Sequence, residues 1–184
     1  MHGIIFSELR KYVVAKLGGP DGWDSLTARA KLGDKLYLPT REYPDAEAAA
    51  LVDAAASMTG ADGDRILQDF GEFMVPDLLR LYGALLDPTW RTLDVIEHTE
   101  VTIHRVVRLR NPGARPPELR CTRPGPDEVT LLYSSARRMC GVAKGIARGL
   151  ASHFGDTIDV AESSCMAAGA PECRIAIRLV RAGA

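Results

Sequence analysis

The histidine with the clearest chemical potential, His104, lies in the segment LDVIEHTEVTIHRVVRLR, residues 93–110. The apolar spacing of this segment predicts a helix. Val101 and Val107 stand three residues to either side of His104, so we expect the imidazole to project from a partly apolar strip. A proline-rich turn, NPGARPPELRC, follows the helix.

Three polar side chains stand at alternate positions downstream of that turn. Tyr133 and Ser135 are two residues apart, which places both hydroxyls on one face of an extended strand. Arg137 follows, where we expect the strand to give way to a helix. A positive charge gains nothing from the dipole at a helix start, which suggests that Arg137 binds an external anion. Imidazole, phenol, hydroxyl and guanidinium groups together suit a large planar ligand with a metal centre and acidic tails.

These residues resemble the heme–nitric oxide/oxygen binding family (H-NOX), which is related to the heme domain of soluble guanylate cyclase. Tyr133, Ser135 and Arg137 match the family's Y-x-S-x-R motif, which binds the heme propionates. His104 stands where the family has its proximal iron ligand, and Pro117 matches the proline that presses on the porphyrin. Further matching positions are Met1, Gly3, Pro112, Gly113, Arg115, Arg120 and Cys121.

The resemblance also assigns a distal face to the heme. Oxygen-binding members place a tyrosine five residues after the motif arginine, where this chain has Val142. The other two distal polar positions correspond to Leu9 and Met74, and we expect Ile5 to pack against the porphyrin. Ferrous-bound O2 needs a hydrogen-bond donor far more than NO or CO does, so this face implies a protein that binds NO and CO. Tyr12 and Tyr82 are the candidate donors if O2 binds after all.

The function that the resemblance implies is a bacterial-type gas sensor with heme b and no catalysis of its own. In such a sensor NO weakens the bond to His104 and frees its helix to shift, so the bond is the two-state element. We expect no attached effector domain, and hence signal transduction to a separate partner. The family usually pairs with histidine kinases or diguanylate cyclases.

Composition is that of an ordinary globular protein and excludes several other classes. The 184 residues favour one domain, 1–184, with a helical distal lobe of about 1–60 and a proximal lobe of about 61–184. The net charge of −1 gives no indication of a nucleic-acid or membrane-surface partner. We find neither a signal peptide nor a long apolar run, so we expect a cytoplasmic protein.

The order of the predicted elements indicates an α+β fold, in which an N-terminal helical lobe packs on a C-terminal antiparallel sheet that carries helices. The resemblance implies that the heme lies between the two lobes. We expect Asp21 or Asp24 to cap the second helix, and Pro76 to bend the fourth. The predicted helices are 4–17, a short one ending near 32, 46–58, 66–86, 93–110 and 136–154. The predicted strands are 118–122, 129–134, 157–163 and 173–180.

Three cysteines, Cys140, Cys165 and Cys173, form a second candidate site for zinc. Some bacterial members of the resembling family hold zinc with cysteines in this region. This chain lacks a fourth cysteine just before Cys165, so Glu162 or His153 is the candidate fourth ligand of a closed site. Buried free thiols are common in proteins, so the alternative to a zinc site is three unliganded cysteines.

Two other functions remain open. One is a zinc-bound thiol redox sensor with little or no heme, and the other is a small-molecule-binding module resembling vinyl-reductase-type domains. An enzyme is the least favoured, because the sequence has no visible nucleophile–base pair or phosphate loop. His2 and His153 lack motif support as iron ligands, and we expect His98 and Arg138 to be solvated.

Overall fold

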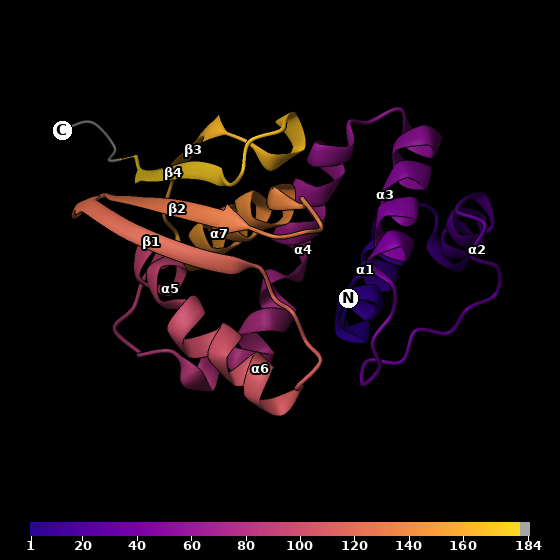
Figure 1. The fold of residues 1–184 in the computed structure, drawn as a ribbon, viewed down its shortest axis with the longest axis horizontal. Coiled ribbons are helices and arrows are strands. Elements are labelled where there is room, and N and C mark those ends of the chain that lie inside the picture. The colour runs from indigo at the N-terminus through magenta and orange to yellow at the C-terminus, as the bar shows by residue number, and fades with distance from the viewer. Residues whose placement is uncertain (181–184) are drawn as a thin grey trace.

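The computed structural model describes residues 1–180, which form two lobes joined by a long helix (Figure 1). The N-terminal lobe consists of three helices. They are α1 (Gly3–Lys16), α2 (Gly19–Arg29) and α3 (Asp45–Thr59). The second helix begins at Gly19 with Gly18 as its N-cap, so the prediction of an aspartate cap is wrong, and Asp21 lies within the first turn.

Helix α4 (Gly63–Tyr82) runs between the lobes and packs along α7 (Cys140–Phe154). Glycines make this close approach possible. A Cβ built on Gly145 would lie 2.0 Å from the carbonyl oxygen of Gln68, and one on Gly71 would lie 2.4 Å from that of Val142. Helix α4 continues through Pro76 as one element. The two helices therefore meet backbone to backbone, and this contact fixes α4 on the C-terminal lobe.

The predicted helix over 93–110 is interrupted. It consists of α5 (Thr92–His98), a π-helical segment η2 (Glu100–His104) and α6 (Arg105–Arg110). The hydroxyl groups of Thr99 and Thr102 donate to the carbonyls of Val95 and His98, at 2.7 and 2.6 Å. Such side-chain bonds to the carbonyl four residues earlier compete with the helix ladder and bend helices. A 3-10 turn, η1 (Gly83–Leu85), precedes α5.

The C-terminal lobe contains a four-stranded antiparallel sheet in the order β1-β2-β4-β3. Its strands are β1 (Glu118–Gly125), β2 (Glu128–Ser134), β3 (Ile158–Ser164) and β4 (Cys173–Leu179), and the 3-10 turn η3 (Met166–Ala168) joins the last two. Register pairs Tyr133 on β2 with Cys173 on β4. The sheet packs through one face on α5 and α7 (Figure 1). The predicted α+β fold is confirmed.

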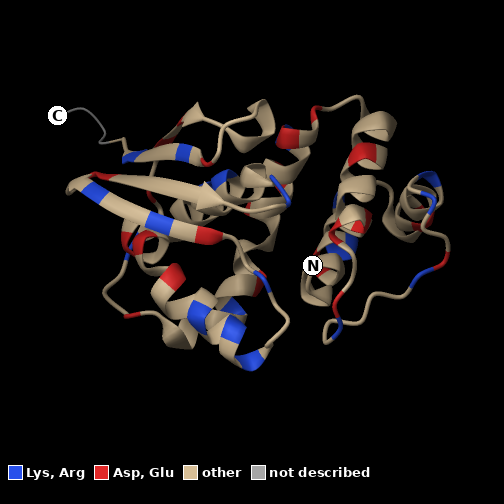
Figure 2. Cartoon of the chain, in the orientation of Figure 1, with Lys and Arg blue, Asp and Glu red and all other residues tan. Residues whose placement is uncertain are grey.

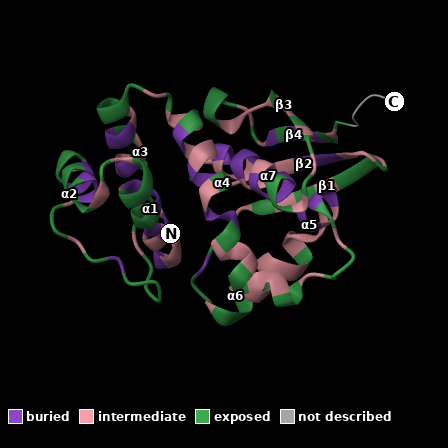
Figure 3. Ribbon diagram, turned by 180° about the vertical axis from the view of Figure 1, so that it is seen from behind, coloured by how far each residue is buried: buried purple, intermediate pink, exposed green. Residues whose placement is uncertain are grey.

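Two cores of buried residues account for the lobes (Figure 3). Phe6, Leu26 and Leu51 belong to the N-terminal core, and Leu131 and Ile175 to the C-terminal one. Helix α4 contributes to both, with Ile66, Phe70 and Met74 in the first and Val75 in the second. A change in the angle between the lobes must therefore be accommodated around α4.

Charged residues of both signs are spread over both lobes, and arginines gather along α6 (Figure 2). Within residues 1–180, none of the helices combines the length and the apolar composition needed to cross a membrane.

Candidate functional site

A cavity of about 600 Å³ lies between the two lobes. Helix α1 contributes to one wall, and α6, the turn after it and the end of β2 contribute to the other. The cavity brings together eight of the nine side chains that the sequence predicts to bind heme. These eight are Ile5, Leu9, Met74, His104, Pro117, Tyr133, Arg137 and Val142. The ninth, Ser135, is not among the lining residues, and its hydroxyl accepts a hydrogen bond from the backbone N–H of Arg137 at 3.3 Å.

His104 enters the cavity from the end of the π-helical segment. Its side chain is 13% exposed, and its Nδ1 lies 2.9 Å from Oε2 of Glu100. Because an ionised carboxylate can only accept, Nδ1 carries the proton and donates it. Nε2 is then the ring nitrogen left to bind a metal.

The surroundings of His104 favour a neutral imidazole. Burial lowers the pKa of His104, and the hydrogen bond and charge of Glu100 oppose this without reversing it. The charge of Arg108 lowers the pKa further, whereas the carbonyl of Pro117 raises it. A neutral imidazole is the form that binds a metal ion.

Tyr133 and Arg137 provide the polar end of the cavity. Tyr133 is 4% exposed, and burial raises its pKa although the hydroxyl of Ser135 and the charge of Arg137 act in the opposite direction. The Arg137 guanidinium donates to the carbonyl of Arg115 at 2.5 Å and lies 3.6 Å from the Asp45 carboxylate. Only 13% of the Arg137 side chain is exposed, so a cation and a phenol converge where acidic tails of a ligand would be neutralised.

Several expectations about neighbouring residues are wrong. Val101 is 62% exposed and does not share a face with His104, because the π-helical segment changes the rotation between them. His98 is half-buried rather than fully solvated, since its ring stacks on Trp90 at a centroid distance of 4.5 Å and its Nδ1 lies 2.8 Å from the carbonyl oxygen of Asp94. Arg137 precedes the helix start by three residues, because α7 begins at Cys140.

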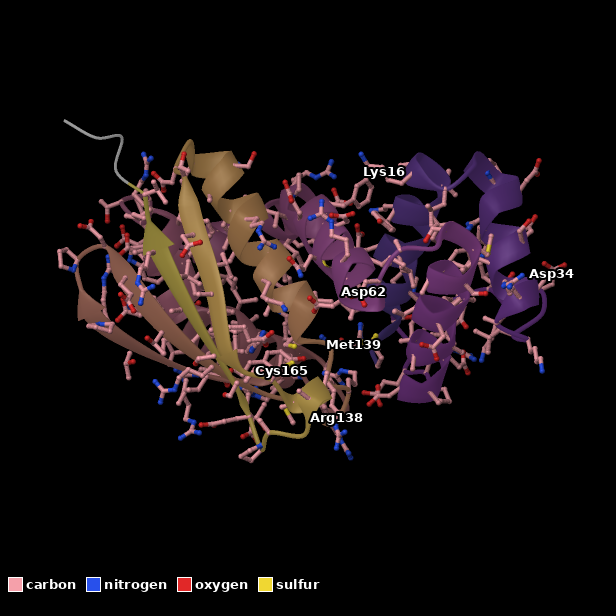
Figure 4. All side chains as sticks on the ribbon, turned by 90° about the horizontal axis from the view of Figure 1, so that it is seen from above. Lys16, Asp34, Asp62, Arg138, Met139 and Cys165 are labelled. Carbon is pink, nitrogen blue, oxygen red and sulfur yellow. The ribbon has the colours of Figure 1, made fainter. Side chains whose placement is uncertain are left out.

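Tyrosines near the distal face differ in position. Tyr82 lines the cavity, whereas Tyr12 packs edge-on against Phe70 and Phe73 outside the lining. Arg138 is exposed, as predicted, and Figure 4 shows it at the outer edge of the molecule. His2 also lines the cavity, but its Nε2 lies 3.1 Å from Oδ1 of Asn111 and is already occupied by this contact.

The three predicted cysteines come together with Glu162. Ligand atoms of Cys140, Cys165, Cys173 and Glu162 all lie within 4.8 Å of one another, and Figure 4 shows Cys165 beside the start of α7. The Sγ atoms of Cys140 and Cys165 are 3.6 Å apart. His153 is exposed and outside this cluster. None of the four cysteines of the chain forms a disulfide.

The environment of Cys140 and Cys173 favours the protonated form of these two thiols. Burial raises the pKa of Cys140 and of Cys173. Oε2 of Glu162 accepts a hydrogen bond from Nζ of Lys144 at 2.9 Å, whereas its Oε1 is buried and has no hydrogen-bond partner among the described residues. Cys121 lies apart from the cluster, and burial raises its pKa to about 11.

Sequence reasoning missed two acidic residues at the site. Glu100 is the partner of His104, and Asp45 is the partner of Arg137. The spacing of Glu100 and His104, four residues, is typical of a helical side-chain pair and was the available signal. Asp45 is remote in sequence, and only the folded chain brings it to Arg137.

Comparison with known proteins identifies the family. The model of the family described as Haem-NO-binding matches residues 2–162. No curated protein sequence matches the chain. Among solved structures, an H-NOX protein from S. oneidensis in the Fe(II)NO ligation state is 26% identical, with a TM-score of 0.90 over 98% of this chain and 100% of that one.

Two further solved structures agree with this result. An H-NOX domain from Shewanella oneidensis in the Fe(II)CO ligation state is 26% identical, with a TM-score of 0.86 over 99% of this chain and 100% of that one. The Fe(II) unliganded H-NOX protein from K. algicida is 21% identical and shares the fold, with a TM-score of 0.86 over 99% and 98%. The chain belongs to the Haem-NO-binding family, and it is an H-NOX heme gas-sensor domain.

Proposed function

We propose that this protein senses NO with a heme that His104 holds through its iron. The observation that carries the proposal is the cavity itself, in which one buried neutral imidazole and the Tyr133–Arg137 pair share an otherwise largely apolar lining. An apolar cavity with few convergent polar groups is typical of a cofactor site. The donor set fits heme, because imidazole is a common axial ligand and guanidinium pairs well with carboxylates.

Each residue of the cavity has a separate task in this proposal. Nε2 of His104 would ligate the iron, and Arg137 and Tyr133, with Ser135 beside them, would hold the propionates. Pro117 and Ile5 pack against the porphyrin. When bound, heme would supply an iron centre that can take up a diatomic gas.

The distal residues of this chain support a preference for NO and CO. Leu9, Met74 and Val142 line the cavity, and none of them can donate a hydrogen bond. Bound O2 is stabilised by such a donor, whereas NO needs it much less. Of the tyrosines, Tyr82 lines the cavity in addition to Tyr133 at the propionate end.

The output of the sensor is movement of the short segment that carries His104. Release of His104 from the iron would free η2 and α6, whose outer residues Val101, Arg105 and Leu109 are exposed. The end of α6 is also connected to the N-terminal lobe through the His2–Asn111 contact. We propose a histidine kinase or a diguanylate cyclase in the cytoplasm as the partner.

The test is the spectrum of the purified protein after reduction. We expect an intense Soret band, and a new nitrosyl spectrum on addition of NO. A colourless protein that takes up no added heme would contradict the proposal.

A second candidate activity, zinc binding, is supported by the cluster of Cys140, Cys165, Cys173 and Glu162. Zn–S bonds of about 2.3 Å in a tetrahedral site place sulfurs roughly 3.8 Å apart, close to the 3.6 Å between Cys140 and Cys165. The buried, unpartnered Oε1 of Glu162 supplies the remaining ligand. Zinc here joins α7 to the β3–β4 turn, and oxidation of the thiols would release it.

A further inference from the structure

The carboxylate of Glu100 lies at the centre of a small network next to the proposed iron ligand. Its Oε2 accepts hydrogen bonds from Nδ1 of His104 at 2.9 Å and from the backbone N–H of Leu119 at 3.2 Å. Its Oε1 accepts from the guanidinium of Arg108. The Glu100 side chain is 26% exposed, so the network is partly shielded from water.

The local backbone brings this pair together. Glu100 and His104 are the first and last residues of the π-helical segment, whereas Arg108 lies one turn farther along, on α6. The N–H of Leu119 comes from the second residue of strand β1. Donors from three directions thus orient the carboxylate toward the imidazole.

Glu100 remains a carboxylate in this environment. Its two oxygens accept three hydrogen bonds, from Nδ1 of His104, the guanidinium of Arg108 and the backbone N–H of Leu119. Hydrogen bonds and a neighbouring cation favour the ionised form of a carboxyl group. An anionic acceptor draws the Nδ1 proton more strongly than a neutral carbonyl does and makes the opposite nitrogen a stronger donor to metal. The carbonyl of Pro117, which also lies near the ring, is a neutral acceptor.

We propose that Glu100 is a positioning residue that gives His104 partial imidazolate character, and so strengthens its bond to the heme iron and stabilises the ferric state. This inference rests on the proposed function, in which His104 is the iron ligand. The stronger bond raises the free energy that NO binding must supply to release His104, and α6 with it, from the iron. Second-shell hydrogen bonding is one of the means by which a protein sets the properties of heme iron.

Arg108 moderates the effect, because it shares the same carboxylate. Its guanidinium withdraws negative charge from Glu100 and thereby weakens the pull on the Nδ1 proton. Removing Arg108 and removing the charge of Glu100 should therefore shift the iron–histidine stretching frequency, and the midpoint potential of the iron, in opposite directions. If these residues had only a structural role, the two variants would not shift the properties of the iron in opposite directions.

The experiment compares Glu100→Gln, Arg108→Gln and the control Glu97→Gln with the parent protein. Glu97 pairs with Arg123 and not with the imidazole of His104. Its variant therefore removes one carboxylate charge near the site and leaves the bond between Glu100 and His104 in place. The measurements are the iron–histidine stretching frequency of the ferrous protein, by resonance Raman spectroscopy, and the Fe(III)/Fe(II) midpoint potential.

We expect a lower stretching frequency and a higher potential in Glu100→Gln. The expected change is about tenfold in the ratio of oxidised to reduced protein, or 59 mV for one electron. Arg108→Gln should show a higher frequency and a lower potential, and Glu97→Gln neither. The exposed Arg108 keeps the proposal testable if Glu100→Gln fails to fold.

The outcomes separate this inference from the proposed function. An iron–histidine band in the parent that neither Glu100→Gln nor Arg108→Gln moves would overturn the role of Glu100 alone. Shifts of the same sign in both variants would do so as well. A parent protein without any iron–histidine band would overturn the proposed function, and the inference with it.

Discussion

The backbone N–H of His104 donates to the carbonyl of Thr99, five residues earlier, at 3.0 Å. This bond defines the π-helical turn that ends at His104, and π turns occur often at functional sites. In an uninterrupted helix Val101 and His104 would lie on one face. Here Val101 is 62% exposed, whereas the His104 side chain is 13% exposed and lines the cavity. The extra residue in the turn thus aims the imidazole inward.

His104→Gly, supplied with free imidazole, should keep heme but lose the response of α6 to NO. The imidazole replaces the ligand without a covalent connection to the helix. Hydrogen exchange over residues 100–110 measures the response, and we expect it to rise with NO in the parent only. An equal rise in the variant would show that movement of α6 does not depend on His104.

Arg137→Ala should fold normally but lose heme faster on dilution. Each charge-assisted hydrogen bond to a propionate contributes about 1.5–3 kcal/mol, or roughly 10- to 150-fold in retention. Arg138→Gln is the matched control, because it removes the neighbouring charge from an exposed residue. Heme loss from Arg137→Ala at the rate of the parent would exclude Arg137 from the propionate site.

Zinc content should be about one ion per chain, and it should depend on the cluster. Cys165→Ser removes a ligand and should weaken binding strongly, whereas Cys121→Ser, outside the cluster, should not. Elemental analysis after dialysis against a mild chelator gives the comparison. A parent protein that holds no zinc after exposure to it would contradict this site.

Gly145→Ala should destabilise the protein by about 1–3 kcal/mol, as overpacking does. The added methyl would meet the backbone of Gln68 on α4, which has little freedom to move. Gly63→Ala is the control, because its Cβ would lie 3.5 Å from the Val52 side chain, an ordinary contact. Urea unfolding would contradict the prediction if the two variants were equally stable.

Sequence alone predicts the elements better than the details that position the site. Residues such as Val142, Ile146 and Leu150 have helical spacing, and the helix forms, but it starts at Cys140 because Arg138 adopts a φ of 52° just before it. The π-helical turn at His104 was not predicted, since it depends on hydroxyl bonds from Thr99 and Thr102 to local carbonyls. Periodicity cannot detect such a change.

The sequence predicts which side chains line the cavity better than it predicts the residues that pair with them. The motif residues and the distal residues do line one cavity, because each lies on the inward side of its element. Asp45 beside Arg137 and Lys144 beside Glu162 are tertiary contacts between distant segments. No local pattern in the sequence indicates them.

The reduced parent protein should bind NO and CO but form no stable O2 complex in air. A hydrogen bond to bound O2 contributes about 1–3 kcal/mol, and Leu9, Met74 and Val142 offer none. Val142→Tyr should introduce or strengthen O2 binding if the phenol points inward. A stable oxy spectrum in the parent would show that another donor reaches the ligand, with Tyr82 the first candidate because it lines the cavity.

Resonance Raman spectroscopy of the reduced, unliganded protein shows whether His104 binds the heme iron. We predict an iron–histidine band that shifts when histidine is labelled with ¹⁵N, persists in His98→Gln and disappears in His104→Gly without added imidazole. An unchanged band in His104→Gly would show that another residue is the ligand, and would contradict the account.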